Sequence, residues 1–218
     1  MSVIPIGRAD AAGVITADLR EALLSGVFAP GTSLEAELLV SQMGGDPAAV
    51  RAALTELERD GLVVHSLHRG VEVARITADE LRDVYAARRV YEAAGLQAML
   101  RRRPVDVSWL NAAVERMGEA AVAGNERALV EADIAFHLAI VAAAGSRRVT
   151  RAAQAALMEL RLVLSAADRA ANDMPAVVAD HQYLVEVFRG AHVRESVAAL
   201  EDHLARGEGL ARTAASAL

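Results

Sequence analysis

From about residue 76 to its end, the chain is a series of helical patterns separated only by very short breaks. These breaks consist of Gly, Asn, Asp, Ser and Pro residues, which interrupt helices. The pattern predicts six helices, or seven, at about 77–103, 106–123, 126–144, 146–171, 175–189 and 193–214. Helices joined by such short connections favour an antiparallel all-α bundle.

The composition agrees with a mainly α fold. Hydrophobic residues make up 54% of the 218 residues, aromatic residues only 3%, and alanine, which loses little side-chain entropy in a helix, is very common. The absence of cysteine excludes disulfides and thiolate metal sites. No apolar run approaches the ~20 residues that span a bilayer, and the N-terminal stretch MSVIPIGRAD lacks the apolar segment of a signal peptide. We therefore expect a cytoplasmic protein without a membrane partner.

The first 75 residues have a different pattern, with three helices followed by two short β-rich runs. The third helix is predicted to begin at Asp46-Pro47, a capping residue followed by a proline suited to the first helical position, and to end at Gly61. The β-rich runs at 62–66 and 71–75 are joined by Leu-His-Arg-Gly and predict a hairpin. This order is typical of a winged helix-turn-helix DNA-binding domain. A small α+β domain without a DNA role would show the same order. We predict two domains, 1–75 and 76–218.

The stretch 133–137, Asp-Ile-Ala-Phe-His, places a carboxylate and an imidazole four positions apart on one helix face. His181 and His203 lie on two later predicted helices. If these side chains converge inside the bundle they need a partner, because isolated charges and imidazoles are costly to bury. Mixed nitrogen and oxygen ligation suits divalent zinc, nickel, manganese or iron. The alternative is that they are ordinary hydrogen-bonded or surface residues.

Taken together, the two regions resemble a GntR-type transcription regulator of the FadR class with an FCD effector domain, closer to the shorter VanR-type variant. The resemblance lies in the stretches DLREALLSGVFAPGTSL, VRAALTELERDGLVV and RGVEVARITADELRDVYAARRVYE, and then in DIAFH, His181 and His203. The histidines follow one another in the family's order and at separations within its usual range.

The resemblance implies a homodimer in which two winged domains bind palindromic double-stranded operator DNA. It also implies a helical domain that binds a small carboxylate metabolite and a divalent metal ion, zinc first, through Asp133, His137, His181 and His203. Arg88 and Glu92 match the family's Arg-x-x-x-Glu, so Arg88 is a candidate effector-binding residue. The alternative for this pair is a simple ion pair within one helix.

The predicted DNA-binding region departs from the family pattern. Where relatives have a Ser-Arg-Thr-Pro-type run at the start of the recognition helix, this chain has GGDPAAVRAAL, with Pro47 in place of the usual arginine. Residues 1–75 contain six Arg and ten acidic residues. Because phosphate neutralisation supplies much of DNA affinity, we expect weaker or altered DNA binding. The candidate DNA-binding residues are Arg51 in the helix and His68, Arg69 and Gly70 in the wing.

The sequence therefore favours a metabolite-responsive transcriptional regulator, most simply a repressor, rather than an enzyme. One alternative is a dimeric metal- or metabolite-binding protein with weakened or lost DNA recognition, which the Pro47 departure favours. Another is a metal-dependent hydrolase, since such a metal site can activate water. The sequence shows no nucleophile motif and no phosphate-binding loop that would support the hydrolase.

Overall fold

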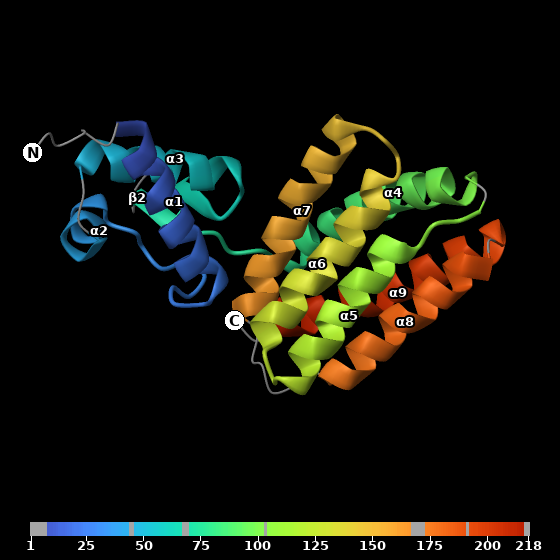
Figure 1. Cartoon of the computed structure of the whole chain (residues 1–218). Coiled ribbons are helices and arrows are strands. Elements are labelled where there is room, and N and C mark those ends of the chain that lie inside the picture. Colours follow the sequence, from blue (N-terminus) through green and yellow to red (C-terminus); the bar gives the residue numbers. More distant parts are fainter. Residues whose placement is uncertain are drawn as a thin grey trace, which may run out of the picture. The chain divides into compact units, whose positions relative to one another are not determined.

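The computed structural model describes the chain apart from residues 1–7, 44–45, 67–69, 103, 167–172, 191 and 216–218. Its described part contains nine helices and one two-stranded sheet (Figure 1). The mainly α fold predicted from the sequence is thus confirmed. The chain forms two compact units, Met1–Arg75 and Ile76–Leu218. No helix in the described part is both long enough and apolar enough to cross a membrane.

The first unit is a winged helix-turn-helix. Its elements are α1 (Arg8–Leu24), α2 (Ala36–Met43), α3 (Pro47–Arg59), β1 (Val63–Ser66) and β2 (Gly70–Val73). The two strands pair antiparallel, with Val63 opposite Val73. The segment after the Pro30-Gly31 turn joins the edge of this sheet, because the Leu34 N–H donates to the Val71 carbonyl at 2.7 Å. The predicted hairpin and three helices are therefore present.

Helix α3 begins and ends as its capping residues predict. The Asp46 side chain accepts a hydrogen bond from the Ala48 N–H at 2.9 Å, and Pro47 occupies the first turn. One face of the helix, including Val50, Leu54 and Leu57, is buried, and α3 packs against α1. The helix ends just before Gly61, whose φ of 74° lies in the left-handed region that favours glycine.

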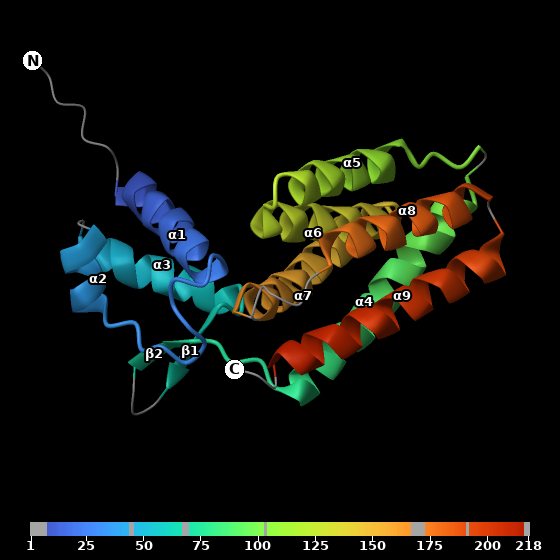
Figure 2. The same ribbon diagram turned by 90° about the horizontal axis from the view of Figure 1, so that it is seen from below.

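The second unit is the predicted antiparallel bundle, with six helices in its described part. They are α4 (Ala78–Leu100), α5 (Ser108–Val122), α6 (Glu126–Ala142), α7 (Arg147–Ala166), α8 (Met174–Gly190) and α9 (Val193–Ala215). Helix α4 packs against α6, α7 and α9, and Figure 2 shows α9 running alongside it. A capping box between Thr77 and Glu80 fixes the start of α4. The core includes the fully buried Phe136 and Phe188.

One helix end of the bundle differs from the expected one, and a second cannot be compared with it. Helix α4 ends at Leu100, about three residues before the expected Arg103. Pro104 has no N–H to donate to the Leu100 carbonyl, so the hydrogen bonds of the helix stop there. The fourth expected helix of the bundle, 146–171, has its end outside the described residues, and α7 is described to Ala166.

Helices α4 and α6 lie very close together at Gly95. A Cβ atom at this position would lie 2.0 Å from the Ile140 carbonyl oxygen and 2.9 Å from the Val141 Cα, both of which are backbone atoms. Only glycine therefore allows the two helices this separation. The crossing matters for function because α4 and α6 both supply side chains to the site described below.

We predict that Gly95→Ala lowers the free energy of unfolding by about 1–3 kcal/mol, since the added methyl group must push two backbones apart. Chemical denaturation followed by circular dichroism measures this change. Gly118→Ala in α5 is the matched control, because its Cβ would meet nothing within 4 Å. The control should be neutral or stabilising by up to about 1 kcal/mol. Equal behaviour of the two variants would contradict the close approach.

Candidate metal centre

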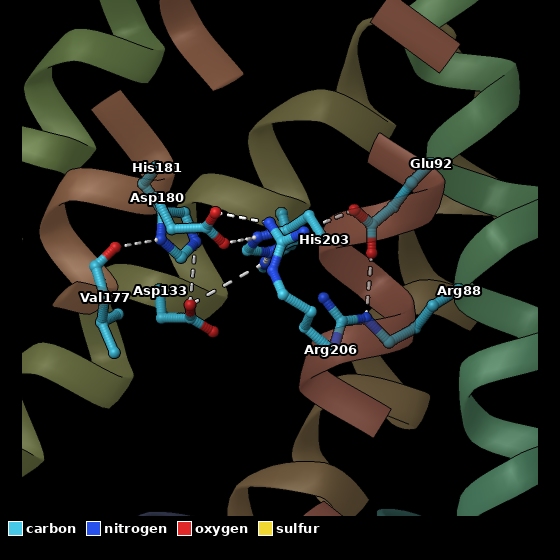
Figure 3. Close-up of polar contacts among 9 residues, drawn as sticks. Arg88, Glu92, Asp133, Val177, Asp180, His181, His203 and Arg206 are labelled. Atoms are coloured by element: carbon cyan, nitrogen blue, oxygen red, sulfur yellow. Dashed lines mark hydrogen bonds and ion pairs between the residues drawn. The ribbon is translucent and has the colours of Figure 1, made fainter. Parts of the chain in front are cut away.

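Three buried histidines from three helices meet in the second unit. His137 comes from α6, His181 from α8 and His203 from α9, and one ring nitrogen of each lies within 4.8 Å of the others. Asp133 lies one turn before His137, and its Oδ1 is 3.0 Å from the His181 Nε2 and 3.8 Å from the His137 Nε2 (Figure 3). The structure thus places the four candidate metal-binding residues together.

The Nδ1 atom of each histidine is held by an oxygen of a neighbouring residue. The partners are the Glu92 Oε2 for His137 at 2.6 Å, the Val177 carbonyl for His181 at 2.9 Å and the Asp180 Oδ2 for His203 at 2.6 Å. A carbonyl or an ionised carboxylate can only accept, so each Nδ1 carries the proton. In the neutral imidazole each Nε2 is then left with its lone pair, which is how histidines are prepared as metal ligands.

The Nε2 atoms point at one another. The Nε2 atoms of His137 and His203 are 3.2 Å apart, and the buried His181 Nε2 forms no aligned hydrogen bond although Asp133 is close to it. Lone pairs facing one another at this distance repel, and a buried polar atom without a partner is costly. A cation among these atoms would remove both penalties. The residues present therefore fit a divalent metal ion with nitrogen and oxygen ligands.

The electrostatics of the site also favour a cation. Burial, reinforced by the nearby charge of Arg88, lowers the pKa of His137 to about 4, so its imidazole is neutral. Burial alone would raise the pKa of Asp133, but His137 and His181 lower it below its usual range, so the carboxylate is ionised. Burial also opposes protonation of His181, yet Asp133 raises its pKa overall. The Asp133 carboxylate thus attracts positive charge to this point.

Glu92 connects the metal centre to Arg88. One carboxylate oxygen accepts from the His137 Nδ1, and the other accepts from the Arg88 Nε at 2.9 Å. Both Arg88 and Glu92 are at most 4% exposed. The pKa of Glu92 is lowered although burial alone would raise it, because His137 and Arg88 both favour its anion. The sequence predicted only the Arg88–Glu92 pair and missed the bond to His137, which requires the packing of α4 on α6.

Asp180 is a residue of the site that the sequence analysis did not single out. It precedes His181 on α8, but its carboxylate holds His203 and Arg206 on α9. The hydrogen bond from His203 is the main reason that its pKa falls to about 2. An aspartate next to a candidate ligand is a weak signal. The spacing of the residues could not show that this aspartate holds a histidine on another helix.

A cavity of about 460 Å³ opens beside the three histidines. Arg88 and Tyr85 of α4 line it, and the Arg88 guanidinium lies 4.9 Å from the centre of the Tyr85 ring. The Arg88 Nη2 is buried and has no hydrogen-bond partner. This arrangement leaves one cationic donor beside the cavity available to a ligand.

The structure describes two of the four candidate DNA-binding residues. Arg51 is exposed on α3 and forms no ion pair with the described part of the chain, and Gly70 begins β2 with a φ of 73°. His68 and Arg69 fall outside the described residues. Pro47 and Ala48, at the exposed start of α3, present no charged group.

Comparison with protein families gives matches to both units. The FCD domain model matches residues 83–206, which is more than half of the chain, and the model for bacterial regulatory proteins of the gntR family matches residues 11–73. The chain belongs to the GntR family of transcriptional regulators with an FCD domain. This result confirms the predicted resemblance. It also confirms that this regulator is not an enzyme, because the matched families and relatives are transcriptional regulators.

Individual relatives agree with this family. A protein of Paenarthrobacter nicotinovorans named "Probable D-xylose utilization operon transcriptional repressor" is 24% identical over 169 residues, covering 77% of this chain and 74% of the relative. The crystal structure of a GntR transcriptional regulator from Rhodococcus sp. RHA1 has a TM-score of 0.83 at 25% identity, covering 93% of this chain and 98% of that one. E. coli McbR/YncC has the same fold, with a TM-score of 0.74 at 16% identity over 93% and 97% of the two chains.

We predict that Glu92→Ala lowers the free energy of unfolding by about 3–5 kcal/mol, because it leaves the buried Arg88 charge unpaired. Thermal and urea denaturation of metal-free protein measure this loss. The control is Glu186→Ala, which breaks the exposed Arg189–Glu186 pair on α8 and should cost at most about 1 kcal/mol. Losses of similar size in the two variants would show that the buried pair is not a structural element.

Proposed function

We propose that this regulator is a homodimeric cytoplasmic repressor whose FCD domain binds a divalent metal ion, zinc first, and a small carboxylate effector. Two winged units of the dimer would bind a palindromic operator. The observation that most supports the metal is the convergence of three histidine Nε2 atoms, each with its Nδ1 proton already donated elsewhere. The expected ligands are Asp133, His137, His181 and His203.

A zinc ion held by these ligands would supply a Lewis acid that attracts a carboxylate oxygen. The residues around the ligands have separate tasks. Glu92, Asp180 and the Val177 carbonyl fix the orientation of the three imidazole rings, and Asp133 supplies the negative charge. Arg88 offers its unpartnered Nη2 to a ligand oxygen, as expected of a guanidinium that recognises a carboxylate.

Helix α4 gives the effector a route to the DNA-binding unit. It is the first helix of the second unit, so it follows the winged unit directly in the chain. It also contains Arg88 and Glu92, which a bound carboxylate and a bound metal would both affect. An effector can change DNA binding only by favouring one arrangement of α4 over another. Release of DNA on effector binding is the mode that we propose.

The start of α3 supports a second candidate, a regulator with weakened DNA recognition. Asp46 places a carboxylate at the N-terminus of this helix, and Pro47 and Ala48 follow it without a cationic group. Arg51 remains as the exposed arginine in the first half of α3. We propose that DNA binding persists through Arg51 and the wing, with altered specificity.

We predict that each of the variants His137→Ala, His181→Ala and His203→Ala lowers zinc affinity by about a hundredfold or more. Loss of a residue that merely orients a metal ligand already costs about tenfold to a hundredfold. Competition with a chromogenic chelator measures the affinity, and elemental analysis after dialysis measures the zinc content. His192→Ala is the control, because His192 is exposed at the start of α9 and outside the histidine cluster. Unchanged zinc affinity in the three variants would refute the metal site.

We predict that Arg51→Ala weakens binding to the operator by about tenfold to a hundredfold and relaxes its sequence preference. Fluorescence anisotropy across a salt series, with DNA from the gene's upstream region and a scrambled duplex, measures both effects. Arg59→Ala is the matched control at the far end of the same helix, where helix-turn-helix proteins make fewer base contacts. Equal losses in the two variants would mean that Arg51 acts only as a general positive charge.

A further inference from the structure

We infer that the effector is a monocarboxylate with an uncharged, apolar body, an inference that rests on the proposed metal- and carboxylate-binding function. The inference comes from the walls of the cavity and from the charges that line it. The inference narrows the proposed effector from carboxylates in general to monocarboxylates with an apolar body. Dicarboxylates and polyanions are thereby excluded as preferred effectors.

The described walls of the cavity away from the histidines are mostly aliphatic. Leu129 and Leu160 are at most 2% exposed, and Val130, Val177 and Leu210 extend the same surface. A volume of about 460 Å³ is in the range of small-molecule sites, which are mainly apolar with few polar groups. The part of a ligand that lies away from the metal centre would therefore contact aliphatic carbon.

The two arginines that line the cavity each have a carboxylate partner. Arg88 is neutralised by Glu92 at 2.9 Å. Arg206 is neutralised by Asp180, and its side chain is 54% exposed. The three histidines are neutral when they act as metal ligands. At the histidines, a divalent ion bound beside Asp133 would then leave one net positive charge, which a single carboxylate balances. Asp173 also lines the cavity, but it is exposed, so solvent screens its charge.

A second carboxylate on the ligand would have no described cation to meet that is not already paired, because Arg206 is held by Asp180. Inside the cavity it would face either the aliphatic wall or the carboxylates of Asp173 and Asp180, which also line the cavity. Burying an ionised group without a partner is strongly unfavourable. The described buried cationic nitrogen without a partner is the Arg88 Nη2, beside the metal centre, where the first carboxylate binds. The cavity therefore selects against a second charge.

Isothermal titration of the zinc-loaded regulator with hexanoate, adipate and hexanamide tests this inference. These probes share a chain length and differ in the number of carboxylates. We expect hexanoate to bind at least about tenfold more tightly than adipate and than the uncharged amide. Adipate binding as tightly as hexanoate, or more tightly, would overturn the inference and leave the proposed function standing. Binding of neither acid to protein of measured zinc content would overturn the inference and the carboxylate effector together.

A variant of the wall separates a specific contact from non-specific binding of an aliphatic acid. Val130→Thr keeps the shape of the side chain and adds a hydroxyl group to the cavity, so it should weaken hexanoate binding about threefold to tenfold. Val90→Thr makes the same change at an exposed position of α4 outside the described lining and should leave the affinity unchanged. Equal effects of the two variants on hexanoate would also overturn the inference.

Discussion

The Nδ1 hydrogen bonds of His137, His181 and His203 are the constraint on which the organisation of the second unit depends. Each bond fixes the tautomer and the direction of a ring, and two of the three join different helices. Glu92 of α4 holds His137 of α6, and Asp180 of α8 holds His203 of α9. Because a shift of one helix would break these bonds, the histidine cluster also ties α4 to α6 and α8 to α9. The same packing requires glycine at position 95, where α4 and α6 approach each other.

The buried Arg88–Glu92 ion pair is better explained by the positions in which it holds its two charged groups than by a contribution to stability. An apolar pair of similar volume commonly stabilises a helical core as well as or better than a buried ion pair does. Here the pair places a guanidinium beside the cavity and a carboxylate behind His137 at the same time. Arg88, Glu92 and His137 therefore form a continuous chain of contacts from the cavity to the candidate metal centre. Since two of these residues lie on α4, a ligand bound at either end would contact the helix that follows the DNA-binding unit.

In the winged unit, the negative charge at the start of α3 has opposite effects on helix stability and on DNA binding. Asp46 stabilises the start of α3 because its carboxylate accepts a backbone N–H and interacts favourably with the positive end of the helix dipole. In a DNA-binding helix this start faces phosphates and base edges, so the same charge opposes DNA. The acidic composition of residues 1–75 adds to this effect. The DNA recognition that we propose for this regulator therefore depends on few cationic contacts.

The sequence by itself determined the order and type of the elements, the family, and the identity of the candidate ligands. The signals for these elements are local: helix periodicity, the capping residues Asp46-Pro47 and Thr77, and the terminating Gly61. Such signals can be recognised from neighbouring residues without knowledge of the fold. Asp133 and His137 could be paired because they share one helix face. Only the tertiary structure decided that Glu92 and Asp180 hold the histidines, that the Arg88 Nη2 lacks a partner, and that the cavity wall is aliphatic. These contacts join residues that are 23 or more positions apart, and helix packing, rather than spacing along the chain, brings them together.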